Sequence, residues 1–185
     1  MKGVIFNIVE EIVIELYDAD TWDALLDAAN SDGVFTALGD YPSSELVAIV
    51  MAASEATGLA PADVLELVGR RAFPKLLERM PEASRPPLSD PFTFLRGVND
   101  IIHPEVRKLY PDSVPPAFEF ADVDGALQLT YRSKRGMQSL AEGLMYGVGD
   151  MHGVELSIER VGEVTDGSIY MIRVLQPAEL ESAAT

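Results

Sequence analysis

Apolar residues recur every three or four positions through the first 110 residues of the chain, which is the spacing of amphipathic helices. We expect Asp20 to cap the second helix, with Asp23 at the fourth position of a capping box. A serine cap at Ser43 begins the third helix and Gly58 ends it. The predicted helices cover residues 1–17, 20–30, 43–58, 60–81 and 92–110.

Prolines mark the loops, starts and interruptions of these predicted helices. Residues 81–91 contain four prolines and form the clearest loop. Pro61 suits the first turn of its helix, whereas Pro74 lies inside the same helix and is expected to kink or divide it. Pro104 interrupts the last apolar stripe, so we expect that helix to be kinked or to start again at His103.

Beyond residue 116 the pattern changes to alternating apolar and polar positions, as in strands half-buried against a helical layer. Hairpin turns are predicted at residues 122–126 and 162–168, and a glycine-rich helix at 136–153. We predict an α+β fold in which a helical N-terminal lobe packs on a lobe with a four-stranded antiparallel sheet and one inserted helix. The tail, 179–185, is expected to fray. The predicted strands are 117–124, 126–133, 154–161 and 168–175.

Composition narrows the possible functions. The chain of 185 residues has no cysteine, which excludes disulfides, thiolate catalysis, cysteine zinc sites and iron–sulfur clusters. Its only histidines are His103 and His152, so any metal needs carboxylates or the ligands of a cofactor. We interpret His152 as structural or exposed, and Met137, Met145 and Met151 as packing residues.

Charge bears on partners and location. The formal net charge of −16 would repel nucleic acid and anionic membranes, and it is typical of a soluble bacterial protein or of one that docks on a basic partner. No apolar run is long enough to span a membrane. Glu10, Glu11 and Glu15 interrupt the apolar N-terminus, which is unlike a signal peptide, so we predict a cytoplasmic protein without membrane insertion.

Two features carry candidate chemistry. His103 lies in the interrupted helix and is either an ordinary buried histidine or a ligand, since neutral imidazole is the commonest metal ligand. A strand extending through residues 129–137 would place Tyr131, Ser133 and Arg135 on one face. This row is either a solvated strand face or a clamp for carboxylate or phosphate groups. No Glu, Asp or His that could act as a base is near these three residues in the sequence. They therefore suit binding of an anion better than catalysis on it.

Haem suits both features together. The porphyrin supplies four iron ligands, so the protein needs only one histidine, and the two propionates need hydrogen-bond donors. A hydrolase fits poorly, because no Gly-x-Ser-x-Gly motif is present. Phosphate-binding Walker and Gly-x-Gly-x-x-Gly loops are absent as well.

Four segments resemble the haem-nitric oxide/oxygen-binding (H-NOX) family, which includes the sensor domain of soluble guanylate cyclase. They are MKGVIFN at the start, TWDALLDAA at 21–29, HPEVRKLYPDSVPP at 103–116 and YRSKRGM at 131–137. The resemblance covers nearly the whole chain. It implies one sensor domain over residues 1–185, with a distal lobe at 1–65, a haem-anchoring lobe at 66–178 and the haem between them.

The resemblance also implies residue roles. His103 would be the proximal ligand of haem b, Tyr131, Ser133 and Arg135 would bind the propionates, and Pro116 would distort the porphyrin. Oxygen-binding members carry a tyrosine where this chain has Leu140. The other distal positions, all apolar, are Ile5, Val9, Ala72, Leu76 and Leu144.

The resemblance therefore implies a non-enzymatic sensor that binds nitric oxide, with carbon monoxide as a second ligand, and excludes oxygen. Arg70, Arg71 or Tyr146 could change this selectivity by reaching the distal side. The output would be a separate partner, a histidine kinase or a cyclic-di-GMP enzyme. A haem-dependent enzyme and a haem-free interaction module remain the alternatives.

Overall fold

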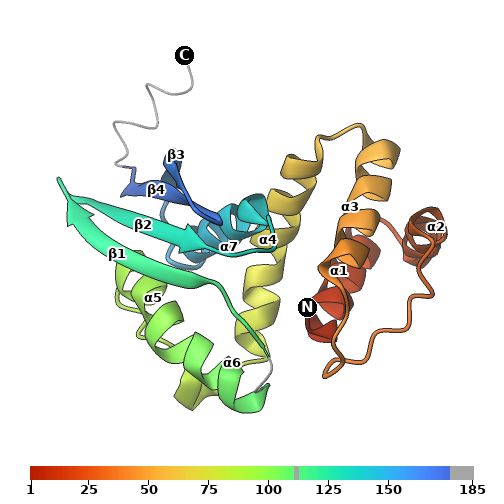
Figure 1. Cartoon of the computed structure of the whole chain (residues 1–185), viewed down its shortest axis with the longest axis horizontal. Coiled ribbons are helices and arrows are strands. Elements are labelled where there is room, and N and C mark those ends of the chain that lie inside the picture. Colours follow the sequence, from red (N-terminus) through yellow and green to blue (C-terminus); the bar gives the residue numbers. More distant parts are fainter. Residues whose placement is uncertain (111–112, 176–185) are drawn as a thin grey trace.

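The computed structural model describes residues 1–110 and 113–175 and has the predicted α+β fold. Helices α1 (Gly3–Leu16), α2 (Ala19–Ala29) and α3 (Ser43–Thr57) lie together on one side of the long helix α4 (Pro61–Glu78) (Figure 1). The sheet and the remaining helices lie on its other side. The predicted frayed tail, 179–185, is outside the described residues.

Two helix caps differ from the prediction. Asp18, not Asp20, caps α2, because its carboxylate accepts hydrogen bonds from the backbone and hydroxyl of Thr21, both at 2.7 Å. Ser43 is the first residue of α3 rather than its cap, and the cap position is held by Pro42. Gly58 ends α3 in the left-handed conformation (φ 76°), as predicted.

Helix α4 runs unbroken through Pro74, so the expected division at this residue is wrong. Proline has no N–H to bond the carbonyl of Arg70 four residues earlier. Gly147 of α7 (Gln138–Met151) lies against this turn, where an added Cβ would be 3.1 Å from the Arg70 carbonyl oxygen. The backbone of α7 therefore packs closely on the part of α4 that Pro74 leaves without a helical bond.

The predicted restart at His103 is confirmed. Helix α5 (Pro91–Gly97) passes into a single π-helical turn, η2 (Val98–Ile102), and α6 (His103–Leu109) then begins with Pro104 in its first turn. The backbone N–H of His103 donates to the Val98 carbonyl, which is the wide hydrogen bond of a π turn. This turn places the proline where its missing N–H is tolerated.

The sheet consists of β1 (Ala117–Val123), β2 (Ala126–Arg132), β3 (Leu156–Val164) and β4 (Gly167–Val174), all paired antiparallel in the order β1-β2-β4-β3. Both hairpin turns form as predicted; Asp124 and Gly125 have the positive φ angles of a tight turn. Strand β3 starts two residues later than predicted and bulges at Val161. Strand β2 is largely buried on both faces, whereas half-burial was expected.

Two apolar clusters make up the core. The first joins α1, α2, α3 and the first part of α4 through residues such as Phe6, Trp22 and Ala72. The second joins the end of α4 to α5, α7 and the sheet, beginning at Phe73. Helix α4 thus belongs to both clusters, and the predicted boundary between residues 65 and 66 falls inside it.

Polar contacts also join the two sides. Glu11 and Glu15 of α1 form ion pairs with Lys75 of α4 and with Arg79, the residue just after α4. At the other end of α1, the Lys2 ammonium lies 2.5 Å from the Asp40 carboxylate and 4.8 Å from the ring centre of Tyr110, just after α6. The described part of the chain contains no single helix able to cross a membrane; α3 and α4 meet the length and composition criteria only together, across a 109° bend.

Helices α4 and α7 touch through their backbones at Gly143. A Cβ added there would lie 2.0 Å from the Glu66 carbonyl oxygen and 2.8 Å from the Arg70 nitrogen. Gly143→Ala should therefore lower the free energy of unfolding by about 1–3 kcal/mol, as overpacking of a core does. Urea unfolding measures the loss. In Gly162→Ala the nearest atom would be Ile169 Cδ1 at 3.5 Å, so this control should change stability by less than about 0.5 kcal/mol. Equal losses in both variants would contradict the packing argument.

Candidate functional site

His103 is the first residue of α6 and only 9% of it is exposed. Burial, followed by the positive charge of Arg107, lowers the pKa of His103 to about 4, so the imidazole is neutral at pH 7. Among the described residues, its buried Nδ1 has no hydrogen-bond partner. A neutral ring with an unsatisfied nitrogen is the form of histidine that binds a metal.

The ring of His103 packs against β1. The ring centres of His103 and Phe118 are 5.1 Å apart, and Phe118 lies opposite Tyr131 across the β1–β2 pair with 5.8 Å between their centres. Asn99, in η2, accepts a hydrogen bond from the Phe118 backbone at 3.4 Å. The side chain of Asn99 thus bonds to β1. Sequence reasoning missed Phe118, whose only signal was the alternation of β1.

Tyr131, Ser133 and Arg135 come together differently from the prediction. Strand β2 ends at Arg132, so only Tyr131 lies on a strand, while Ser133 and Arg135 belong to the following turn. The backbone N–H of Ser133 donates to the Asp166 carbonyl at 2.6 Å, and that of Arg135 donates to the Ser133 hydroxyl at 3.3 Å. Gly136 completes the turn with φ 66°.

The three side chains nevertheless form one group. Burial raises the pKa of Tyr131, and a hydrogen bond with Ser133 and the charge of Arg135 oppose that rise. No carboxylate of the described residues forms an ion pair with Arg135. A guanidinium beside two hydroxyls can grip a carboxylate. Pro116 lies just before β1, two residues from Phe118.

The predicted distal residues gather in the first apolar cluster. They come from three helices, and those that are only partly buried pack against its fully buried members. Leu144 also contacts the second cluster. The set consists of Ile5 and Val9 of α1, Ala72 and Leu76 of α4, and Leu140 and Leu144 of α7.

The three polar side chains that could have altered this wall are turned elsewhere. Arg70 makes a two-point ion pair with Asp150, at 2.6 Å for each bond, and its guanidinium lies over the ring of Tyr146. Tyr146 itself lines a surface pocket of about 390 Å³. Arg71 is exposed.

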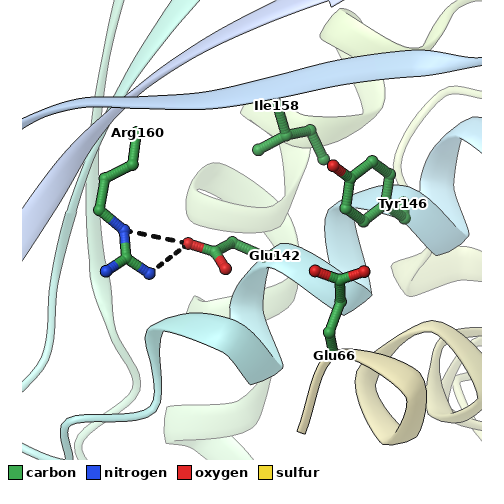
Figure 2. Close-up of a pocket in the computed structure, with 5 residues that line it drawn as sticks. All are labelled: Glu66, Glu142, Tyr146, Ile158 and Arg160. Atoms are coloured by element: carbon green, nitrogen blue, oxygen red, sulfur yellow. Dashed lines mark hydrogen bonds and ion pairs between the residues drawn. The ribbon is translucent and has the colours of Figure 1, made fainter. Parts of the chain in front are cut away.

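This surface pocket is separate from the predicted site residues, since none of them lines it. Figure 2 shows Glu66 of α4 beside Glu142 of α7, whose carboxylate is bound to Arg160 of β3 at 2.5 and 3.2 Å. Burial raises the pKa of Glu66, and the charge of Glu142 adds to the rise. The lining of this surface pocket is mainly polar, unlike the apolar cluster that contains the predicted distal residues.

Comparison with known proteins decides the family. The sequence profile of the family described as Haem-NO-binding matches residues 2–160. The chain belongs to the H-NOX family. A search of curated proteins finds no match.

Solved H-NOX structures share the whole architecture. An H-NOX protein from S. oneidensis in the Fe(II)NO state is 26% identical, with a TM-score of 0.82 over 95% of this chain and 100% of that chain. The Fe(II) unliganded H-NOX protein from K. algicida is 26% identical, with a TM-score of 0.81 over 95% of this chain and 97% of that chain. The H-NOX domain of Shewanella oneidensis in the Fe(II)CO state is 26% identical, with a TM-score of 0.84 over 95% of this chain and 99% of that chain.

H-NOX domains are haem-binding sensor domains, and the residues of this chain fit that cofactor. Nδ1 of His103 makes no hydrogen bond within the described structure, so the ring retains an unpartnered nitrogen. Within the same residues, no cluster of three or more histidine and carboxylate side chains could hold a bare metal ion. A porphyrin requires a ligand for its iron, partners for its carboxylates and an apolar surface. An imidazole, a guanidinium beside two hydroxyls and an apolar cluster are groups of these three kinds.

The lowered pKa of His103 predicts a pH dependence of stability. Between pH 6.5 and pH 4 the histidine is protonated in the unfolded chain but remains neutral in the folded protein. The free energy of unfolding of the haem-free protein therefore falls as pH falls. His103→Leu removes this contribution, which amounts to about 3 kcal/mol over the window. Urea unfolding of both proteins measures the difference. The difference in free energy of unfolding between the two proteins should be constant from pH 7 to 8, where His103 is neutral in both the folded and the unfolded chain. A difference that stays constant down to pH 4 would refute the lowered pKa of His103.

Proposed function

We propose that this H-NOX protein senses nitric oxide with a His103-ligated haem b, excludes oxygen, and signals to a separate protein. The observation that carries the proposal is the buried, neutral His103 with an unsatisfied ring nitrogen. Bound haem would supply the iron, four of its ligands and a position for a diatomic gas.

Each part of the site has a role in this proposal. His103 binds the iron from α6. Tyr131, Ser133 and Arg135 hold the propionates, and the charge of Arg135 contributes most because charge-assisted hydrogen bonds are the stronger ones. Pro116, next to β1, presses on the porphyrin. Residues 66–178 form the anchoring lobe and 1–65 the distal lobe.

Selectivity follows from the distal wall. Oxygen on haem iron is stabilised by a nearby hydrogen-bond donor. The six distal side chains are aliphatic, and Arg70 and Tyr146 face the surface on the other side of their helices. The wall therefore favours nitric oxide and carbon monoxide over oxygen.

The signal is a displacement of α6. This helix begins at the iron ligand and follows a π turn, and its far end meets the distal lobe where Tyr110 contacts Lys2. Release or binding of His103 biases the position of α6 against β1 and against the N-terminal lobe. A ligand that prefers one of two such arrangements is sufficient for a switch.

The partner is proposed to be a histidine kinase or a cyclic-di-GMP enzyme in a bacterial cytoplasm. The net charge of −16 supports a partner with a basic docking surface. Binding should therefore weaken as salt concentration rises, because exposed charges are screened.

The role of His103 has a direct test. Ferrous protein expressed with a haem supply should show a Soret band, and His103→Gly should lose it and regain it on addition of free imidazole. Free imidazole replaces the missing ring in the space that the glycine leaves. His152→Gln is the matched control and should not affect the band. The buried Nε2 of His152 also lacks a partner among the described residues, but its Nδ1 bonds the Val148 carbonyl at 2.8 Å. A Soret band in His103→Gly without imidazole would contradict the assignment.

Gas selectivity has a separate test. The reduced wild-type protein should take up nitric oxide and carbon monoxide but form no stable oxygen complex in air, as followed by absorption spectra. Leu140→Tyr introduces a donor on the distal wall and should stabilise oxygen by about 1 kcal/mol or more. Leu140→Phe adds the ring without the hydroxyl and should not. A stable oxygen complex of the wild-type protein would refute exclusion.

A further inference from the structure

Phe118 joins the two halves of the candidate site. Its ring centre is 5.1 Å from that of His103, with 41° between the planes, and 5.8 Å from that of Tyr131, with 34° between the planes. The proposed iron ligand and the first residue of the proposed propionate clamp therefore contact the same aromatic ring.

The position of Phe118 is fixed on the sheet side. Phe118 and Tyr131 are directly opposite in the β1–β2 register, so their side chains share one face of the sheet. The backbone N–H of Phe118 donates to Asn99 in the π turn just before His103. Phe118 is thus attached by its backbone to the turn that starts α6 and by its ring to the first residue of α6.

Packing rather than hydrogen bonding holds the His103 ring. The residue is buried, and among the described residues its Nδ1 has no hydrogen-bond partner. The Phe118 ring is an aromatic packing contact of this imidazole. An aromatic contact of this kind restricts ring rotation by packing.

Building on the proposed function, we propose that Phe118 is a positioning residue: its ring orients the His103 imidazole toward the iron and couples α6 to Tyr131. It does not touch the gas. Its contribution is to make the ligand and the clamp move as one unit, so that a shift of His103 reaches strands β1 and β2.

Phe120 provides a matched control for ordinary packing. It lies on the same face of β1, is similarly half-buried, and packs 6.1 Å from Phe118. Its ring contacts Arg96, whose guanidinium lies 5.9 Å from its centre and pairs with Asp122 at 2.6 Å. If the β1 aromatics only fill space, Phe118→Leu and Phe120→Leu should have the same effect.

The first experiment uses the ferrous haem-bound protein. Phe118→Leu should shift and broaden the iron–histidine stretching band in resonance Raman spectra and raise the rate of haem transfer to apomyoglobin roughly tenfold, as removal of a ligand-orienting contact does. Phe120→Leu should leave both unchanged, and Phe118→Tyr, which keeps the ring, should match wild type. Identical spectra for Phe118→Leu and wild type, or equal shifts in the two leucine variants, would overturn the proposal.

A second measurement separates this proposal from haem binding. In protein purified without haem, hydrogen–deuterium exchange of residues 98–109 should be roughly tenfold faster in Phe118→Leu than in wild type, and unchanged in Phe120→Leu. A wild-type protein without a Soret band would refute the proposed function, and the exchange data would still decide whether Phe118 holds α6. Equal exchange in all three proteins would refute that role.

Discussion

His103 can act as the proposed iron ligand only while its imidazole is neutral and a ring nitrogen is free. Burial at the start of α6 accounts for the neutral ring, and Nδ1 has no hydrogen-bond partner among the described residues. The π turn of η2 places this residue where Pro104 forces the helix to begin again. Burial then holds the pKa well below 7, and nearby Arg107 lowers it further. The π turn thus sets the position of His103, and burial at that position keeps its imidazole neutral.

The contacts of α4 differ in kind on its two sides. Toward α7, glycine backbones touch and leave no room for a methyl group. Toward α1, α4 packs through the side chains of the first apolar cluster. Ion pairs with Glu11 and Glu15 at one end of α4 supplement this cluster, and partly exposed pairs of this kind contribute little stability. The α4–α7 contact is therefore made by backbones, and the α1–α4 contact by side chains.

The sequence allowed the α+β class, both hairpins and the restart at His103 to be predicted, because each has a local cause in spacing or in proline and glycine chemistry. Where two residues competed for the same task, local reasoning failed: Asp18 and Asp20 can both cap α2, and only Asp18 is positioned to bond Thr21. The turn of α4 that Pro74 leaves without a helical bond packs against α7, which is far away in the sequence. Phe118 was missed for the same reason, since its contacts with His103 and Tyr131 depend on strand register and on how α6 packs against β1.

The absence of a distal donor among the side chains considered follows from helix geometry. Successive residues of an α-helix are separated by 100°, so a residue two positions away points to nearly the opposite side. Leu140 and Leu144 are four apart and share one face of α7, whereas Tyr146 is two beyond Leu144 and faces the surface pocket. The same relation separates Arg70 from Ala72 on α4, and the ion pair with Asp150 holds Arg70 on the outer side. Register thus keeps the Tyr146 hydroxyl and the Arg70 guanidinium away from the wall.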